Sequence, residues 1–458
     1  MKDALRTFGS FRDPSGTVFT RDGVLYRQIN ECYRAQYERL NASGLYARLT
    51  KAELLVSHRE SDGAPLTAEA FLVIEPERVP MISYPYEWSF SMLRDAALVT
   101  LRAHRAALDA GMILKDASAY NVQFLRGRPV LIDTLSFDLY RDGVPWVAYG
   151  QFCRHFLAPL LLMAYKDIRL NRLMSLYIDG IPLDLATKLL GGKGGFFARQ
   201  HIVWHAKSIA DHDEDGKRKA ERKQAKLPLS MHVALIDSLI RGVSAIKPPL
   251  AQTEWGDYYA HTNYSGTAFA SKTALIEAYL EQVAPRTVWD IGANDGRFSR
   301  LGLKHGASVV ALDIDPKAVE SGYLWARREK APLLPLLCDL TNPSPAIGFA
   351  LRERDALASR GKPDCILALA VIHHLAISNN LPLPMIAEWL SSLCERLIIE
   401  FVPKEDSQTR LLLSTRDDIF PNYTKEGFEE AFSAFFDIER AEAVTDSCRT
   451  MYLMRSKR

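Results

Sequence analysis

The strongest constraint on the fold comes from residues 288–299, Val-Trp-Asp-Ile-Gly-Ala-Asn-Asp-Gly-Arg-Phe-Ser. The apolar start predicts a buried strand, the glycines predict a tight turn, and the residues after them predict a helix. Glycine has no Cβ, so the backbone of the turn can approach a ligand closely. Asp290 is placed at the strand end to accept hydrogen bonds from an amino group or a ribose. Open α/β sheets hold small ligands at such turns.

The same turn argues against one class of ligand. Dinucleotide-binding turns follow G-x-G-x-x-G, and the second glycine lets a pyrophosphate lie on the helix N-terminus. Asn294 stands at the place of that second glycine, and Asp295 follows it. An acidic side chain there would repel a pyrophosphate. We therefore expect a ligand with a cationic or neutral centre.

Beyond residue 255, helix-length segments alternate with short apolar runs, which predicts a parallel-rich sheet with helices on both faces. The runs are residues 287–291, 308–314, 335–338, 365–369, 396–401 and 451–454. In such a sheet, ligands bind at the carboxyl ends of the strands.

Carboxylates recur at these predicted strand ends. Asp313 ends the second strand about 20 residues after Gly292, where its two oxygens can grip a ribose diol. Asp315 precedes a proline and better fits a helix N-cap than a ligand contact. Asp339 and Leu340 pair a carboxylate with an apolar side chain, which suits the amino group and ring face of adenine. The set predicts a nucleoside ligand.

In this order and spacing the segments resemble the motifs of class I S-adenosylmethionine-dependent methyltransferases. Residues 290–296 resemble the first motif, Asp313 the acidic residue after strand two, residues 338–340 the adenine contact and residues 364–375 the fourth segment. Four ordered motifs are more specific than any single one. The resemblance implies an α/β, Rossmann-like sheet of seven strands, with a last antiparallel strand at residues 449–455.

The resemblance also implies S-adenosylmethionine as the cofactor and methyl transfer as the activity. The expected cofactor-binding residues are Asp290, Gly292, Ala293, Asn294, Gly296, Asp313, Ile314, Asp339, Leu340, Leu369 and Tyr264. Tyr264 belongs to the aromatic-rich residues 255–272, which in this family fold over the cofactor. Ordinary packing of these aromatic side chains is the alternative, and it stays open.

Methyl transfer is an in-line displacement whose rate comes mainly from alignment of the two reactants. A general base is needed only for a hydroxyl or a protonated amine. The candidate bases are His373, His374 and Glu400. Histidine has a near-neutral pKa, although such a pair is common in relatives without being catalytic. Glu400 ends a buried strand and fits a structural acceptor equally well.

The first half carries a different pattern. Asp116 and Asn121 form D-x-x-x-x-N, and a later apolar run ends in Asp133. This resembles the catalytic loop and metal aspartate of kinase-like phosphotransferases. The resemblance implies Asp116 as the base, with Asn121 and Asp133 holding Mg²⁺ beside the phosphates of ATP.

The departures from that pattern are substantial. The H-R-D motif is replaced by residues 114–116, Leu-Lys-Asp, and Thr134 and Leu135 replace the Phe-Gly after the metal aspartate. No glycine-rich loop with a following lysine strand is clear, and residues 24–27 read as a remnant strand with Arg27 in place of lysine. Three interpretations stay open: phosphotransfer, a degenerate module that binds substrate or partner, and side chains that merely cap turns.

We expect three regions: an α+β, degenerate kinase-like domain at 1–210, a charged linker with a connecting helix at 211–254, and the methyltransferase domain at 255–458. A kinase-like half joined to a methyltransferase is similar to bacterial nodulation-type methyltransferases. That similarity implies a small-molecule or glycan acceptor.

Composition narrows the class without naming a partner. With 458 residues, 48% hydrophobic and 24% charged, the chain fits a soluble protein of two or three domains. A net charge of +2 gives no strong nucleic-acid signal. The longest apolar stretch, near residues 156–165, is too short to span a membrane. Scattered cysteines without a CxxC pair favour free thiols in the cytoplasm, and His201 and His205 do not complete a metal site. The oligomeric state is left open.

Overall fold

The computed structural model describes residues 4–203, 227–249, 265–414 and 416–458. The chain divides into two compact units, Met1–Leu250 with Ala346–Asp355, and Ala251–Pro345 with Ala356–Arg458. Tyr264 and His205 lie outside the described residues, so the predictions made for them have no structural counterpart. In the described part of the chain, none of the helices combines the length and the apolar character that a bilayer crossing requires.

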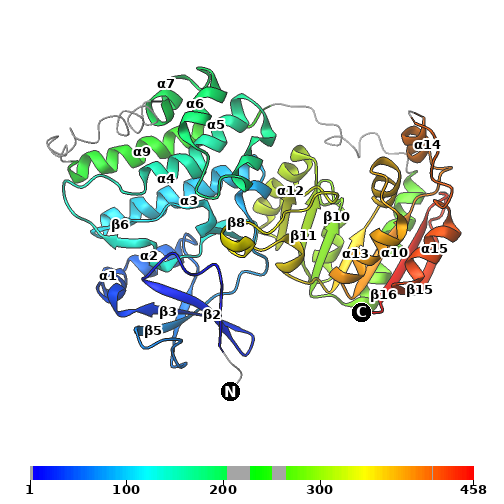
Figure 1. The fold of residues 1–458 in the computed structure, drawn as a ribbon, viewed down its shortest axis with the longest axis horizontal. Coiled ribbons are helices and arrows are strands. Elements are labelled where there is room, and N and C mark those ends of the chain that lie inside the picture. Colours follow the sequence, from blue (N-terminus) through cyan, green and yellow to red (C-terminus); the bar gives the residue numbers. More distant parts are fainter. Residues whose placement is uncertain (1–3, 204–226, 250–264, 415) are drawn as a thin grey trace. The chain divides into compact units, whose positions relative to one another are not determined.

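The first unit begins with a five-stranded antiparallel sheet in the order β1-β2-β3-β5-β4 (Figure 1). Its strands are β1 Leu5–Arg6, β2 Gly16–Arg21, β3 Val24–Asn30, β4 His58–Ser61 and β5 Ala70–Pro76. Helices α1 Arg34–Ala42 and α2 Leu45–Lys51 join β3 to β4. Arg27 therefore lies on a true strand, as the remnant-strand interpretation requires, and β3 pairs with both β2 and β5.

A long central helix, α3 Phe90–Asp109, follows the sheet. Alanine, leucine and arginine, which are strong helix formers, fill much of it. Most of its side chains are buried, because further helices pack around it. After α3 come β6 Met112–Leu114, the hairpin β7 Val122–Leu125 and β8 Arg128–Leu131, and β9 Phe137–Leu139, which pairs with β6.

The rest of the first unit is helical. The apolar stretch near residues 156–165 lies in a π-turn, Cys153–Leu157, and in α5 Ala158–Tyr165, which continues it. The remaining helices are α4 Tyr149–Phe152, α6 Leu183–Leu190, α7 Gly195–Ala198 and α9 Leu229–Ala245, with shorter turns at Ile168–Ser175 and Arg199–Val203. Helix α9 packs on α3.

One segment of the first unit comes from far along the chain. Residues 346–355 follow the third strand of the second unit in sequence but belong to the first unit by their contacts. The buried Glu353 carboxylate accepts hydrogen bonds from the Arg12 guanidinium at 2.5 and 3.1 Å. The Asp355 backbone N–H donates to the Tyr84 hydroxyl at 2.8 Å. No pattern in the sequence predicted that residues 346–355 would belong to the first unit.

The second unit is built on a seven-stranded mixed sheet in the order β12-β11-β10-β13-β14-β16-β15. The five parallel strands are β10 Thr287–Ile291, β11 Ser308–Asp313, β12 Leu333–Leu337, β13 Cys365–Ala368 and β14 Arg396–Phe401. Strand β16 Thr450–Ser456 runs antiparallel to β14, and β15 Phe436–Ala443 closes the edge. The predicted α/β sheet of seven strands with a last antiparallel strand is confirmed.

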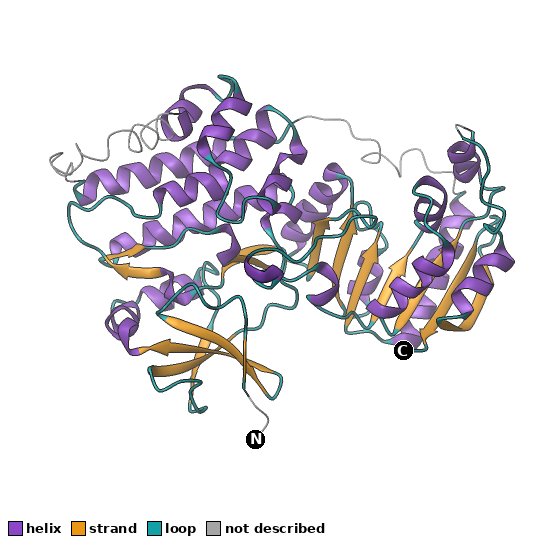
Figure 2. Cartoon of the chain, viewed as in Figure 1, coloured by secondary structure: helices purple, strands orange, loops and turns teal. Residues whose placement is uncertain are grey.

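Helices cover the sheet of the second unit (Figure 2). They are α10 Gly266–Val283, α11 Ser299–Lys304, α12 Pro316–Glu329, α13 Leu383–Leu393, α14 Ser407–Leu413 and α15 Lys425–Ser433. Side chains of α10 form one hydrophobic cluster with Val309 and Ala311 of β11 and with Cys365 and Leu367 of β13, which are alternate positions along each strand. Because strand side chains alternate between faces, the intervening residues face the other side of the sheet.

The strand order decides where a ligand can bind. From β10 the chain proceeds outward to β11 and β12, then returns to β13 on the other side of β10. The order therefore reverses between β10 and β13. A reversal of this kind leaves a crevice at the carboxyl ends of the two strands, since their following segments lead in opposite directions.

Candidate functional site

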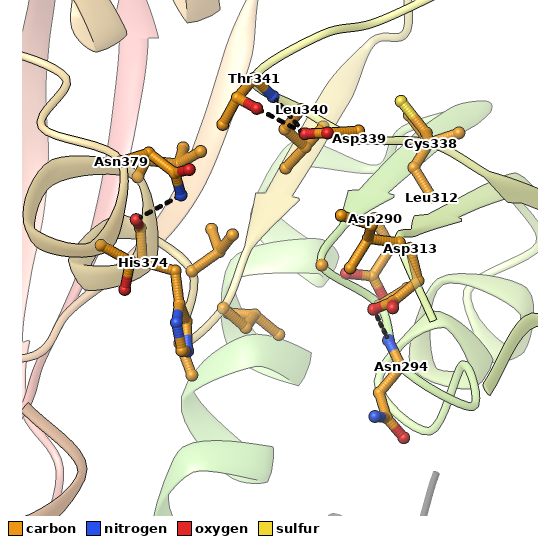
Figure 3. A pocket seen from close by; sticks show the side chains of 18 of the residues that line it. Asp290, Asn294, Leu312, Asp313, Cys338, Asp339, Leu340, Thr341, His374 and Asn379 are labelled. Carbon is orange, nitrogen blue, oxygen red and sulfur yellow. Dashed lines mark hydrogen bonds between the residues drawn. The ribbon is translucent and has the colours of Figure 1, made fainter. Parts of the chain in front are cut away.

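A cavity of about 360 Å³ opens at this crevice (Figure 3). Its lining includes most of the residues expected from the sequence: Asp290, Gly292, Ala293, Asn294, Asp313, Ile314, Asp339, Leu340 and Leu369. Gly296, which was also expected, shapes the turn but is not part of the lining. Motifs that lie far apart in sequence thus meet in one site.

The glycine turn after β10 makes room for a ligand. Gly292 has a φ of +71°, and a Cβ added there would lie 3.0 Å from a methyl group of Val371. Asn294 also has a positive φ, 51°, a conformation that asparagine tolerates better than most residues. The backbone therefore turns tightly beside the cavity. A side chain at the Gly292 position would occupy part of the cavity.

Asp290 is buried at the base of the cavity. One of its oxygens accepts a hydrogen bond from the Ser299 hydroxyl at 2.6 Å. Burial raises the pKa of Asp290 to about 7, although Ser299 and Lys272 oppose the shift. A positively charged or hydrogen-bond-donating ligand would stabilise the ionised form of this carboxylate.

Asp313, at the end of β11, is oriented by backbone donors. It accepts from the Asn294 N–H at 2.7 Å and from the Asp315 N–H at 2.8 Å, one on each oxygen. Burial raises its pKa to about 6. A carboxylate offers about four lone-pair sites, so both oxygens can still accept from a pair of hydroxyls. Asp315 itself caps α12, as its sequence context predicted.

The other end of the cavity joins polar and apolar groups. Asp339 follows β12 and accepts from both the backbone N–H and the hydroxyl of Thr341, at 2.9 and 2.6 Å. Leu340 and Ile314 also line the cavity, and Ile314 is 50% exposed although it is apolar. A half-exposed apolar side chain beside a carboxylate suits an aromatic ring that carries an amino group.

The wall opposite the carboxylates comes from the segment after β13 and from α14. Val371, Leu375 and Leu412 supply apolar contacts, and His374 is the one expected base among the lining residues. Burial lowers the pKa of His374, so its imidazole is neutral at pH 7. The neighbouring His373 ring lies 4.2 Å away, is 2% exposed and does not line the cavity.

Glu400 lies in a buried cluster of charges behind the lining. Its carboxylate accepts from the Lys272 ammonium at 2.6 Å and faces the Arg449 guanidinium at 3.5 Å. Arg449 in turn pairs with Asp406 at 2.8 Å. This placement favours the structural-acceptor interpretation of Glu400 over a role as a base.

Lys272 is a lining residue that the sequence interpretation missed. It belongs to α10, where Ala268, Lys272, Ile276 and Leu280 recur every four residues and are buried. A lysine on the apolar stripe of a helix was the available signal. The alternation of strands and helices indicates ligand positions at the strand ends and does not indicate a position on this helix.

In the first unit, the kinase-like candidates lie in a connected polar cluster. Asp133 pairs with Arg27 at 2.6 Å and accepts from the Ser136 hydroxyl at 2.7 Å. Asn121 donates to the same hydroxyl at 3.3 Å. Asp116 lies near the Asp133 carboxylate. Burial raises the pKa of Asp116, and the Asp133 charge is the second cause of the shift. The three predicted residues thus lie close to one another, and Asp133 among them contacts the strand arginine.

The same carboxylates also stabilise local turns. Asp116 accepts from the backbone N–H of Ser118 at 2.9 Å, and Asp133 accepts from that of Leu135 at 2.9 Å. The turn-capping interpretation is therefore satisfied together with the clustering. Among the described residues, no group of three or more histidine, cysteine, aspartate or glutamate side chains is arranged to hold a metal ion.

Comparison with known proteins gives one extended match. The chain is 36% identical over 457 residues to the nodulation protein NoeA of Rhizobium meliloti (strain 1021), which covers 98% of this chain and 95% of that protein. No family model matches the chain.

Solved structures match parts of the chain. The N-methyltransferase NodS from Bradyrhizobium japonicum WM9 is 11% identical over 42% of this chain and 99% of its own, with a TM-score of 0.32. The magnesium protoporphyrin IX methyltransferase ChlM from Synechocystis PCC 6803, with bound SAH, is 19% identical over 44% and 93%, with a TM-score of 0.31. WbdD, crystallised with a kinase inhibitor, is 17% identical with a TM-score of 0.29, and the match spans 40% of each chain.

Proposed function

The chain belongs to the family of the nodulation protein NoeA, and on that basis we propose that it transfers a methyl group from S-adenosylmethionine to an acceptor. The observation that carries the proposal is the cavity at the strand-order reversal, which gathers Asp290 and Asp313 from the ends of β10 and β11 and Asp339 from the segment that follows β12. Together they supply acceptors for an ammonium, a ribose diol and an adenine amino group.

The lining fits that cofactor in shape as well as in charge. The Gly292 turn leaves open the space that a Cβ would take beside Val371. Asp313 presents two oxygens already oriented by backbone N–H groups. Pre-oriented acceptors lose little entropy on binding, which favours recognition of a rigid ribose.

In the reaction, the bound cofactor supplies a methyl group on a positively charged sulfur. The protein aligns the two reactants and excludes water with the apolar wall of Val371, Leu375 and Leu412. The neutral imidazole of His374 is the lining group placed to accept a proton from a hydroxyl acceptor. We propose a small molecule or a glycan as the acceptor, supported by the nodulation family.

The proposal is tested by calorimetric titration of the full chain with S-adenosylhomocysteine. We expect binding by the wild type and its loss in Asp290→Ala. Asp295→Ala is the matched control, because Asp295 lies in the same turn but does not line the cavity. Absence of wild-type binding, or unchanged binding by Asp290→Ala, would overturn the proposal. A screen of acceptors with isotopically labelled S-adenosylmethionine then identifies what is methylated.

A second candidate function concerns the first unit: nucleotide binding or phosphotransfer by the kinase-like cluster. The observation that favours it is the 2.6 Å pair between Arg27 on β3 and Asp133, since a kinase places its phosphate-binding lysine on this strand. We expect Mg²⁺-dependent ATP binding by the full chain that is lost in Asp133→Asn and kept in Asp138→Asn. If the wild type binds no ATP with Mg²⁺ present, this candidate is rejected.

A further inference from the structure

Two opposite charges meet at the glycine-turn end of the cavity. Asp290 and Lys272 both line it, and each contributes to the electrostatic environment of the other. The Lys272 ammonium lies 4.6 Å over the Phe298 ring, which belongs to the same lining. A carboxylate and an ammonium thus line the same end of the cavity.

Lys272 is costly to bury. Its side chain is 2% exposed, and burial lowers its pKa although Glu400 opposes the shift. Buried ion pairs contribute little net stability, because desolvation of two charges offsets their attraction. An apolar residue would continue the α10 stripe at least as well. Stability of the fold therefore does not account for an ammonium at this wall.

The surrounding charges hold that ammonium at the cavity. Glu400 is shared between Lys272 at 2.6 Å and Arg449 at 3.5 Å, and Arg449 is fixed by Asp406 at 2.8 Å. Asp406 also caps α14 by accepting from the Gln408 N–H at 2.9 Å. Two cations and two carboxylates balance within the cluster, so an ionised Asp290 adds one negative charge to the site.

We propose that Lys272 binds the carboxylate of the cofactor's amino-acid part while Asp290 accepts from its ammonium, so that this end of the cavity recognises an α-amino acid zwitterion. The inference rests on the proposed function and names a residue that determines its cofactor specificity. Glu400 and Arg449 are positioning residues, because they act by holding the Lys272 side chain in place. No bond forms or breaks in this recognition.

Electrostatics favours a zwitterion at this end of the cavity. An ammonium placed against Asp290 would leave its attached carboxylate unbalanced in a buried site unless a cation stood close by. A charge-assisted hydrogen bond from a lysine to a carboxylate is about twice as strong as a neutral one. Ligands that keep the nucleoside but lack the carboxylate should therefore bind more weakly, and only because of Lys272.

The test is calorimetry on the full chain with two ligands, S-adenosylhomocysteine and its decarboxylated analogue, which keeps the ammonium. We expect Lys272→Met to weaken S-adenosylhomocysteine binding about tenfold to hundredfold and to change binding of the analogue by less than about threefold. Lys272→Arg should restore part of the difference. Lys304→Met is the control, since Lys304 is an exposed lysine of α11 paired with Glu277.

The comparison of ligands separates recognition from structural damage. A structural role alone predicts that Lys272→Met weakens both ligands equally, and that result would overturn the inference, as would unchanged binding of both. If Lys272→Met fails to fold, the double variant with Glu400→Gln removes the carboxylate left unpaired and is measured with the same two ligands. Wild-type binding of S-adenosylhomocysteine that is insensitive to Lys272→Met leaves the proposed function standing, whereas absence of wild-type binding rejects the function itself.

Discussion

The two units use aspartates at the ends of strands in different ways. In the second unit, Asp290 and Asp313 line a cavity, and burial raises the pKa of each. In the first unit, Asp133 is paired with Arg27 and accepts from the Ser136 hydroxyl as well. A carboxylate that already forms an ion pair is stabilised less by a cationic ligand than an unpaired carboxylate whose pKa burial has raised toward neutral pH. Sequence spacing therefore identifies the aspartates in both units. The side chains that contact each aspartate determine whether it is available to a ligand.

The largest expected effect is on the methyl-transfer rate, and it comes from a change at His374 on the wall opposite the second unit's carboxylates. His374→Asn should lower the methyl-transfer rate to a hydroxyl acceptor by about 10²–10⁴-fold, because the neutral imidazole would no longer accept the proton. Binding of S-adenosylhomocysteine should change little. His373→Asn is the control, since His373 does not line the cavity. Equal rate losses in both variants would show that the histidine pair acts structurally.

The next effect is on the shape of the cavity. Gly292→Val should weaken S-adenosylhomocysteine binding about a hundredfold, because a Cβ at this position meets Val371 at 3.0 Å and the φ of +71° strains any side chain. Gly306→Val isolates the strain, since Gly306 has a φ of +83° with open space around its Cβ position. Calorimetry measures affinity, and thermal unfolding measures stability. If both variants lose affinity alike, strain and not cavity space is responsible.

The third effect is on the stability of the first unit, through the ion pair between Asp133 and Arg27. Arg27→Met should lower the free energy of unfolding by about 1–3 kcal/mol, since it leaves the Asp133 carboxylate without its cation in a mostly buried position. The pair is 14% and 13% exposed. Arg27→Met with Asp133→Leu should recover part of the loss. Urea denaturation followed by circular dichroism gives both values, and an unaffected single variant would mean that the pair does not hold the fold.

The smallest effect is the pH dependence of ligand affinity in the second unit. The raised pKa values of Asp290, about 7, and Asp313, about 6, mean that the folded protein keeps protons that the unfolded chain has lost. Their stability contribution is therefore present at acid pH and is lost as pH rises toward 7. A ligand that needs both carboxylates ionised should bind about tenfold more weakly when pH falls from about 8 to about 6.

Calorimetry in buffers of different ionisation enthalpy measures the accompanying proton release. Asp290→Asn should remove most of the pH dependence, and Asp418→Asn should leave it unchanged. Asp418 is a surface carboxylate whose pKa is lowered by Lys404. An affinity that stays flat across this range would show that the two buried carboxylates do not titrate with the ligand.

The sequence predicted the parallel strands well because both of their faces are buried. Residues 288–291 and 309–313 are largely apolar runs with Asp290 and Asp313 at or next to their last position, and the structure places them in β10 and β11. Strand β12 begins two residues before the predicted run and ends at Leu337, so Asp339 lies beyond the strand and not at its end.

Strand β15 was not predicted. Its sequence, Phe-Asp-Ile-Glu-Arg-Ala-Glu-Ala, is rich in charge, and its residues alternate between more and less buried positions at the edge of the sheet. An edge strand with a solvated face needs few apolar side chains, so a search for apolar runs passes over it. In the five-stranded sheet of the first unit, the sequence predicted a strand only at residues 24–27, which fall within β3.

The assignment of residues 346–355 to the first unit could not be predicted from any local sequence pattern. Its place in the first unit depends on Glu353 meeting Arg12, a partner 341 residues earlier in the chain. Nothing in the neighbouring residues specifies a contact at that separation, because burial of Glu353 is decided by the assembled unit.

By itself, the sequence determined the strand, glycine turn and acidic strand ends of the second unit, since each depends on residues close together in the chain. Only the tertiary structure decided which of the candidate groups share a space. It brought Lys272 from α10 to the cavity beside Asp290, set Glu400 behind it as a partner, and left His374 on the opposite wall. These outcomes depend on the packing of a helix against the ends of distant strands, and that packing is a property of the whole core.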